Sequence, residues 1–526
     1  MLIPKHENSS PPPPPPPPQP PTTATEFLFP SANSKILPNP SKYFSSNLLP
    51  SALPTTSFFT NFVVGNGDQP SFIHPYLIKL SPTSSLSLSY PSLSSTSSSI
   101  SHSFSPDFTI STPQHSRHLI SSFNDLTVVI KSITSSSTQT KNKIELANKQ
   151  VWVVYSSSEL TLQKKDDNHV ISSKPYSGVV RISIIPTENS NKGEEVLDLY
   201  STCYPTNGEA VFATPFRLDY KWEKKGWGDN LLMLAHPLHL KLISVYNSGI
   251  KVLDDFRYKS IDGDLVAVIG NQWSLRVDHV PISWHSKRGI SEENYPEIAS
   301  AIWKDVGELY SKPISTTHSY HYAIQIYRVA RLGLIAEEIN CMDVIPAIRE
   351  FLKGSIEPWL DGSFEKNGFL YDEKWGGIVC KPGSTDPGAD YGFGLFNNHH
   401  FTLGYFVFCI AVLAKFDHEW GKKFKGHAYA IVASYINLGK KAKKEKSKYA
   451  KLRAFDAYKL HSWTNLLHDE HPRNSENPSS SINAYYSASL LGNVYGDNRS
   501  RLRLLRHGGM SRKVGCMKGS SVRRIK

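Results

Sequence analysis

The chain has 526 residues, of which 39% are hydrophobic and 11% aromatic. A chain of this length exceeds what a single hydrophobic core supports, so we expect two or three folded domains. The formal net charge of +12 comes mostly from the end of the chain, because ten basic residues and no acidic residue follow Asp497. Without those ten, 48 Lys and Arg stand against 46 Asp and Glu, a net charge of about +2, so composition gives no argument for a nucleic-acid-binding protein.

The first residues predict a tail without a core. Eight consecutive prolines at 11–18 favour an extended polyproline II segment, and we expect residues 1–26 to be disordered. No secretory signal is visible before them, and the longest apolar run, 403–414, is too short to span a bilayer. The five cysteines are scattered and match no zinc spacing, which predicts buried free thiols and no metal site.

Residues 27–250 are expected to form an antiparallel β-sandwich. Short β-branched and aromatic runs alternate there with turn residues, as at 57–64, 126–130, 151–155 and 179–185. Strand-like runs at 231–235 and 265–269 extend or bridge this domain, and residues 251–305 are expected to be a connecting region.

The pattern becomes helical after residue 305. Ile326, Val329, Leu332 and Ile335 recur at three-residue steps, and residues 344, 348, 351 and 352 form a second apolar stripe. Further helices are predicted at 405–415, 428–438 and 482–491, which makes 306–497 a helical domain with its polar motifs in the connections.

The first polar motif, 371–377, contains Tyr371, Asp372 and Trp375 and ends in two glycines. Flat aromatic faces suit the apolar faces of sugar rings, and carboxylates bind hydroxyl groups. The alternative interpretation, a loop with a core tryptophan, is equally compatible with the motif.

The second motif, 390–400, contains Asp390, Asn398 and the pair His399 and His400. Adjacent residues point apart, and no metal-ligand spacing is present, so hydrogen bonding to a substrate or to a carboxylate is favoured over metal binding.

The third motif is a polar loop followed by a helix, and its candidate site residues are His461, Trp463, Arg473, Asn474, Glu476, Asn483 and Tyr485. An arginine close to Glu476 would keep this carboxylate ionised, as a base that activates water must be. The alternative is a solvated glutamate that caps the helix.

Taken in order, these motifs resemble glycoside hydrolase family 81, the endo-β-1,3-glucanases, in the form found in plants. The match is collinear over nearly the whole body of the chain, at 27–30, 53–59, 67–70, 74–78, 227–231, 236–238, 262–264, 371–377, 390–400 and 460–486. The resemblance implies an N-terminal β-sandwich, a small connecting domain and a C-terminal (α/α)6 barrel, with a cleft that binds β-1,3-glucan and hydrolyses it with inversion. It implies no metal or other cofactor.

The resemblance also assigns catalytic positions. Inverting hydrolysis needs one carboxylic acid and one carboxylate base. The family's acid motif Tyr-Asn-Asp-His-His corresponds to residues 396–400, so the acid has become Asn398, whereas Glu476 keeps the base. Ser480 replaces a second glutamate and Thr402 a histidine. An amide cannot deliver a proton, and general-acid assistance is typically worth about 10²–10⁴ in rate.

Two hypotheses follow. The chain is an active glucanase that uses Glu476 while another group or water supplies the proton, or it is a glucan-binding pseudoenzyme or non-functional fragment. The implied partner is β-1,3-glucan, with no nucleic acid and no membrane, and the oligomeric state is not predicted. The family suggests a location outside the cell or in the cell wall, whereas the absence of a visible signal suggests the cytoplasm.

The basic residues 498–526 are expected to lie outside the fold, because the family continues at this point with further barrel helices. A frame shift, a mispredicted exon boundary or a decayed gene would explain the difference. The rival hypothesis, a tail that binds nucleic acid or anionic lipid, is weaker because interleaved aromatic residues are missing.

Overall fold

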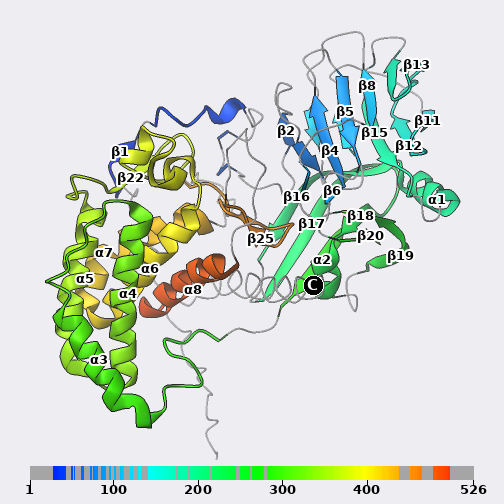
Figure 1. Cartoon of the computed structure of the whole chain (residues 1–526). Coiled ribbons are helices and arrows are strands. Elements are labelled where there is room, and N and C mark those ends of the chain that lie inside the picture. Colours follow the sequence, from blue (N-terminus) through cyan, green and yellow to red (C-terminus); the bar gives the residue numbers. More distant parts are fainter. Residues whose placement is uncertain are drawn as a thin grey trace, which may run out of the picture.

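The computed structural model describes residues 28–32, 34–42, 49–50, 52–53, 61–63, 71–73, 75–80, 85–90, 94–95, 100–101, 107–111, 119–121, 128–131, 140–172, 176, 178–186, 190–212, 216–244, 249–260, 263–277, 281–437, 449–464 and 478–497. The described chain has a β-rich N-terminal part and a helical C-terminal part, with smaller sheets between them (Figure 1).

Two six-stranded sheets make up the N-terminal part. The first has the order β11 (Thr140–Glu145), β12 (Val151–Ser156), β15 (Val179–Ile184), β10 (Val128–Lys131), β9 (Leu119–Ser121) and β2 (Asn61–Val63). The second has the order β13 (Leu162–Asp166), β14 (His169–Ser172), β8 (Phe108–Ser111), β5 (Ser85–Ser89), β4 (Tyr76–Leu80) and β3 (Ser71–Ile73). Because β8 and β14 pair in parallel, the second sheet is mixed, which corrects the purely antiparallel arrangement predicted from the sequence.

One hydrophobic cluster joins these two sheets. Trp152 on β12 stacks on Phe108 of β8, with ring centroids 5.5 Å apart, and lies 5.5 Å from Tyr76 of β4. All three side chains are buried. Helix α1 (Ser190–Tyr200) follows β15, and the short strands β6 (Ser94–Ser95) and β7 (Ile100–Ser101) pair with each other.

Two three-stranded sheets connect the halves: β16 (Cys203–Val211), β17 (Arg217–Gly226) and β21 (Gln272–Arg276); and β18 (Leu232–Ala235), β20 (Leu265–Ile269) and β19 (Lys251–Tyr258). Alternate residues of a strand point to opposite faces. Accordingly, Leu232 and Leu234 join the core of the large sheets, whereas Met233 and Ala235 join the core shared with the helices. The predicted boundary at residue 250 would cut the sheet β18–β20–β19.

The helical part contains α3 (Tyr295–Gly307), α4 (Ser319–Glu338), α5 (Ile345–Asp361), α6 (His399–Phe416), α7 (His418–Ile436) and α8 (Pro478–Val494). The short helix α2 (Pro237–Leu242) and the 3-10 turn η3 (Glu292–Asn294) precede α3, and the 3-10 turn η4 (Met342–Val344) lies between α4 and α5. The predicted helices are therefore confirmed. Helix ends carry the expected caps: Asp417 accepts a hydrogen bond from the Trp420 N–H at the start of α7, and α5 ends at Gly362 with φ 81°.

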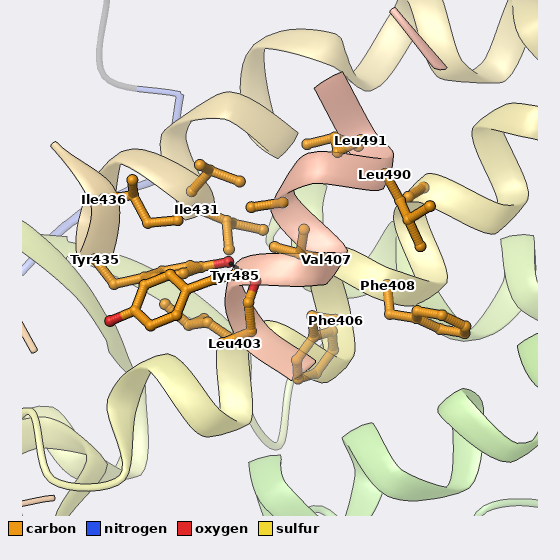
Figure 2. Packing of buried hydrophobic residues seen from close by; sticks show 14 of the residues in the cluster. Leu403, Phe406, Val407, Phe408, Ile431, Tyr435, Ile436, Tyr485, Leu490 and Leu491 are labelled. Carbon is orange, nitrogen blue, oxygen red and sulfur yellow. Dashed lines mark hydrogen bonds between the residues drawn. The ribbon is translucent and has the colours of Figure 1, made fainter. Parts of the chain in front are cut away.

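Helix α6 is the centre of this half. Its apolar side chains, among them Leu403, Phe406 and Val407, pack with α7 and α8 (Figure 2). A Cβ on Gly404 would lie only 2.7 Å from the Cα of Ala484, so glycine allows α6 and α8 to approach closely. Over its 18 residues α6 is apolar enough to cross a membrane, but 78% of it is buried inside the protein.

Residues 28–42 belong to the helical part, although the sequence predicts a place in the β-domain for them. Strand β1 (Ser31–Ala32) pairs in parallel with β22 (Phe369–Asp372), which pairs with β23 (Gly377–Cys380). The Trp375 indole donates a hydrogen bond to the Pro38 carbonyl, at 2.9 Å, and the Phe29 ring packs edge-on against Phe369. The segment ends with the 3-10 turn η1 (Pro40–Lys42).

Candidate functional site

The three polar motifs meet at one end of the helical part. The hairpin β22–β23 carries the first, the turn η6 (Ala389–Leu395) leads through Asn398 into α6, and the small hairpin β24 (Phe455–Asp456) and β25 (His461–Ser462) carries the third. The Asn398 N–H donates a hydrogen bond to the Thr464 carbonyl, at 2.9 Å. Trp463 packs against the cluster that contains Trp375 and Phe396. The structure thus brings together three segments that are far apart in the sequence.

A buried arginine, Arg453, links the first two motifs and α7 to the segment that precedes the third motif. Its guanidinium donates hydrogen bonds to the carbonyls of Trp375, at 2.8 Å, Gly376, at 2.5 Å, and Ser434, at 3.0 Å. The same group lies 3.8 Å above the Phe396 ring, a cation–π contact. Burial lowers the pKa of Arg453 to about 9, and the nearby Asp372 opposes this shift. Its three carbonyl partners compensate the cost of enclosing a charge.

Asn398, the candidate acid position, immediately precedes α6 in the left-handed conformation, with φ 48° and ψ 20°. Asn and Asp are the non-glycine residues that tolerate this conformation best. The Asn398 carbonyl accepts the Thr402 N–H at 3.1 Å, and the side chain is half-buried. The backbone here is fixed independently of whether the side chain is an amide or a carboxyl.

Tyr371, Asp372 and Trp375 are enclosed in the protein, with exposed fractions of 3%, 0% and 1%. Asp372 accepts the Trp375 N–H at 2.8 Å, and burial raises the pKa of the Asp372 carboxyl although Arg453 opposes the rise. Contact between these side chains and a sugar, as predicted from the sequence, would require their exposure. In the structure they form the frame behind the motif loops, which favours the core interpretation of Trp375.

Asp390 is also tied into the frame. One carboxylate oxygen lies 3.6 Å from His318 Nδ1, and the other accepts a hydrogen bond from the Asn367 amide at 3.1 Å. Only 6% of the Asp390 side chain is exposed. Asp390 is therefore held by protein groups, which argues against a replacement role as proton donor to a bound sugar.

His399 and His400 point to different neighbours, as expected for adjacent residues. His399 donates from Nε2 to the Ile378 carbonyl of β23, at 2.8 Å, whereas His400 Nε2 lies 3.4 Å from the Ser481 hydroxyl of α8. Both rings are fully buried. Burial lowers the pKa of His399 well below its usual value and that of His400 to about 3. Both rings are therefore neutral at pH 7 and serve the packing of α6.

The neutral state of His400 makes stability depend on pH. With a folded pKa of about 3 and an unfolded pKa of about 6.5, only the unfolded chain binds the proton between these values. The contribution of His400 to stability is therefore fully present above about pH 6.5, and it falls by about 1.4 kcal/mol per pH unit as the pH decreases through this window; the buried His399 acts in the same direction. We expect His400→Gln to flatten this slope, as measured by urea unfolding at several pH values from 7 down to 5. The same change at the exposed His418 is the control; equal slopes for wild type and His400→Gln would contradict the prediction.

His461 and Trp463 are the accessible members of the third motif. Both are half-buried, their ring centroids are 4.3 Å apart, and the Trp463 indole donates to Asp456 at 3.0 Å. Tyr485 is buried and shares a hydrogen bond with Ser462 at 2.9 Å, whereas Asn483 on α8 is half-buried. Arg473, Asn474 and Glu476 lie outside the described residues.

Sequence reasoning missed Arg453 and Asp456. Both lie in the stretch 452–458, in which every residue is buried and the other five are apolar or aromatic. A charged residue inside such a stretch is a signal of a buried polar contact, but the sequence does not show which carbonyls it serves.

Comparisons with known proteins agree with this architecture. The model of the glycosyl hydrolase family 81 N-terminal domain matches residues 38–128 and 108–286, and that of the C-terminal domain matches 289–505. A soybean (Glycine max) protein named glucan endo-1,3-beta-D-glucosidase is 49% identical over 521 residues, covering 90% of this chain and 76% of the relative. The primary septum glucan endo-1,3-beta-D-glucosidase of Schizosaccharomyces pombe is 24% identical and covers 68% of this chain and 36% of the relative.

A solved structure has the same fold. It is that of a point mutant of a glycoside hydrolase family 81 protein from Clostridium thermocellum. It superposes with a TM-score of 0.70 over 92% of this chain and 72% of its own, at 17% identity. At this identity the likeness concerns the fold alone.

Proposed function

Because the chain belongs to glycosyl hydrolase family 81, we propose that it hydrolyses internal linkages of β-1,3-glucan, the activity of a glucan endo-1,3-β-D-glucosidase. The observation that carries this conclusion is the 49% identity to the soybean glucosidase over 90% of the chain. Matches to both the N-terminal and the C-terminal family domain support it, because the likeness extends over both parts of the chain and is not limited to one motif.

The finer architecture is part of the proposal. The two six-stranded sheets share one hydrophobic core and form a β-sandwich, and helices α3–α8 form part of an (α/α)6-type barrel. The proposed cleft lies at the end of the helices where Asn398, His461 and Trp463 are accessible.

The proposed mechanism uses Glu476 as the base that activates water, with inversion at the anomeric carbon. Asn398 occupies the position from which the leaving oxygen is protonated. Its amide N–H can hydrogen-bond to the glycosidic oxygen, but the proton itself has to come from water, so cleavage should be slow compared with a two-carboxyl enzyme. The burial of Tyr371, Asp372, Trp375 and Arg453 supports a framing role for these residues.

Asn398 favours a second candidate function, the binding of β-1,3-glucan without appreciable hydrolysis. The backbone that carries Asn398 is intact, with its hydrogen bonds to Thr464 and Thr402, so a loss of catalysis need not remove the binding surface. In this case the chain recognises the polysaccharide and holds it.

Incubation of the purified full chain with laminarin tests the proposed function. Endo-cleavage predicts β-1,3-linked oligosaccharides of several lengths before glucose appears, with initial products in the α-anomeric form by NMR and no cleavage of carboxymethylcellulose, a soluble β-1,4-glucan. Laminarin binding without cleavage would favour the second candidate. Neither binding nor cleavage by folded protein would refute both.

A further inference from the structure

We propose that an exposed aromatic surface beside Asn398 is a sugar-binding subsite, formed by Tyr391 with His318, Tyr320, His321 and Phe401. This surface is called the Tyr391 platform below. The proposal rests on the proposed function, because the ligand it names is a glucosyl ring of β-1,3-glucan. It concerns residues that the sequence analysis did not select.

The rings of the platform lie close together on η6 and on the N-terminal turns of α4 and α6. The Tyr391 ring centroid is 4.5 Å from that of His318 and 6.0 Å from that of Tyr320, and the Tyr320 ring is 5.0 Å from that of Phe401. Tyr391 remains 55% exposed. Tyr391 is thus open to solvent while neighbouring aromatic rings pack around it.

The backbone holds Tyr391 in place at an energetic cost. Asp390, Tyr391 and Gly392 follow each other in the left-handed region, with φ values of 50°, 57° and 76°. Glycine accepts this conformation and aspartate tolerates it, whereas a tyrosine is strained there. Since the side chain is more than half exposed, burial does not account for a tyrosine at this position. Strain of this kind concentrates at ligand-binding sites.

The polar groups of the platform complement a sugar. His321 Nε2 and the Tyr391 hydroxyl are 3.0 Å apart, so a polar edge lies beside the aromatic face. A glucosyl ring has apolar C–H faces and a rim of hydroxyl groups, which calls for this combination of a flat ring and few hydrogen-bonding groups.

The platform adjoins the candidate acid position along the chain. The Asn397 N–H donates to the Gly392 carbonyl at 3.1 Å, which closes the loop between Tyr391 and Asn398. Phe401 lies on the first turn of α6, three residues after Asn398. Because an endo-acting enzyme binds several sugar units on both sides of the cleaved bond, a glucan chain at Asn398 has to continue over neighbouring surfaces such as this one.

The test compares laminarin binding by Tyr391→Ala, Tyr391→Phe and a matched control, Tyr310→Ala, in affinity gel electrophoresis of the full chain. Tyr310 is a similarly exposed tyrosine, at 65%, just beyond the end of α3. We expect Tyr391→Ala to weaken binding about tenfold, which corresponds to about 1.4 kcal/mol. Tyr391→Phe keeps the ring and should stay within about twofold, and Tyr310→Ala should bind as wild type.

Tyr391→Gly separates binding from folding, because it removes the ring and also relieves the backbone strain. The subsite predicts weaker binding with a melting temperature that is not lowered. A purely structural Tyr391 predicts a lower melting temperature, which would overturn the proposal. Wild-type affinity in Tyr391→Ala would also overturn it while leaving the proposed function intact. Wild-type protein that neither binds nor cleaves laminarin would refute the function and the subsite together.

Discussion

Replacing Asn398 with aspartate is expected to accelerate laminarin hydrolysis by about 10²–10⁴-fold, the usual worth of general-acid assistance. The new side chain differs by one group and suits the left-handed conformation that Asn398 already has. No rearrangement of the backbone is needed, because the hydrogen bonds of Asn398 to Thr464 and Thr402 use main-chain atoms. The initial rate of reducing-end release gives the measurement.

The acceleration should have a characteristic dependence on pH. An acid has to be protonated to act, an ordinary Asp has a pKa of about 3.9, and the N-terminus of α6 favours the ionised form. The gain should therefore be largest at low pH and decline as the pH rises. Asn398→Ala is expected to give no gain, and Asn398→Asp combined with Glu476→Gln should lose it. Equal rates for Asn398→Asp and wild type from about pH 4 to pH 7, with folded protein, would contradict the assignment of Asn398.

Replacing Arg453 with methionine is expected to destabilise the chain by about 3–5 kcal/mol, because three buried carbonyls lose their charged donor and each unsatisfied acceptor costs about 1–3 kcal/mol. The change leaves the carbonyls of Trp375, Gly376 and Ser434 without their donor and removes the cation at Phe396. Total stabilities are about 5–15 kcal/mol, so a large part of the margin would be lost. Urea unfolding provides the free energies.

The matched control is Arg328→Met at an exposed position on α4, where we expect a change within about 0.5 kcal/mol. Arg453→Lys keeps the charge but offers no planar fork, so it should lie between the two. A stability of Arg453→Met close to that of the control would show that the buried hydrogen bonds contribute little.

The helical half could be predicted from sequence because its signals are local. Ile326 and Val329 lie in one apolar stripe of α4, and a short window of sequence is sufficient to see the period. The pairing of β8 with β14 was missed because a parallel partner is specified by long-range packing, which strand patterns do not contain. The boundary at residue 250 failed for a related reason: β18 has buried residues on both faces and therefore belongs to two cores.

The sequence identified the motifs of the candidate site, but it did not show which of their side chains are exposed to solvent. Asn398, His461 and Trp463 are accessible, whereas Trp375 has the same aromatic character as Trp463 and is buried. Residues far away in the sequence enclose Trp375: its indole donates to the carbonyl of Pro38, 337 residues away, and its ring packs in one cluster with Leu37. Tyr391 was overlooked because its significance depends on a backbone conformation, and a sequence does not display φ angles.

The pairing of Ser31–Ala32 with Tyr371–Asp372 has a practical consequence for dissecting the protein. A recombinant fragment starting at residue 289, where the C-terminal family match begins, would lack an edge strand and would uncover Phe369 and Trp375 to water. Co-expression with a peptide spanning residues 28–42 would supply the missing strand in trans, so complementation of the two pieces is the natural way to obtain the helical half in soluble form.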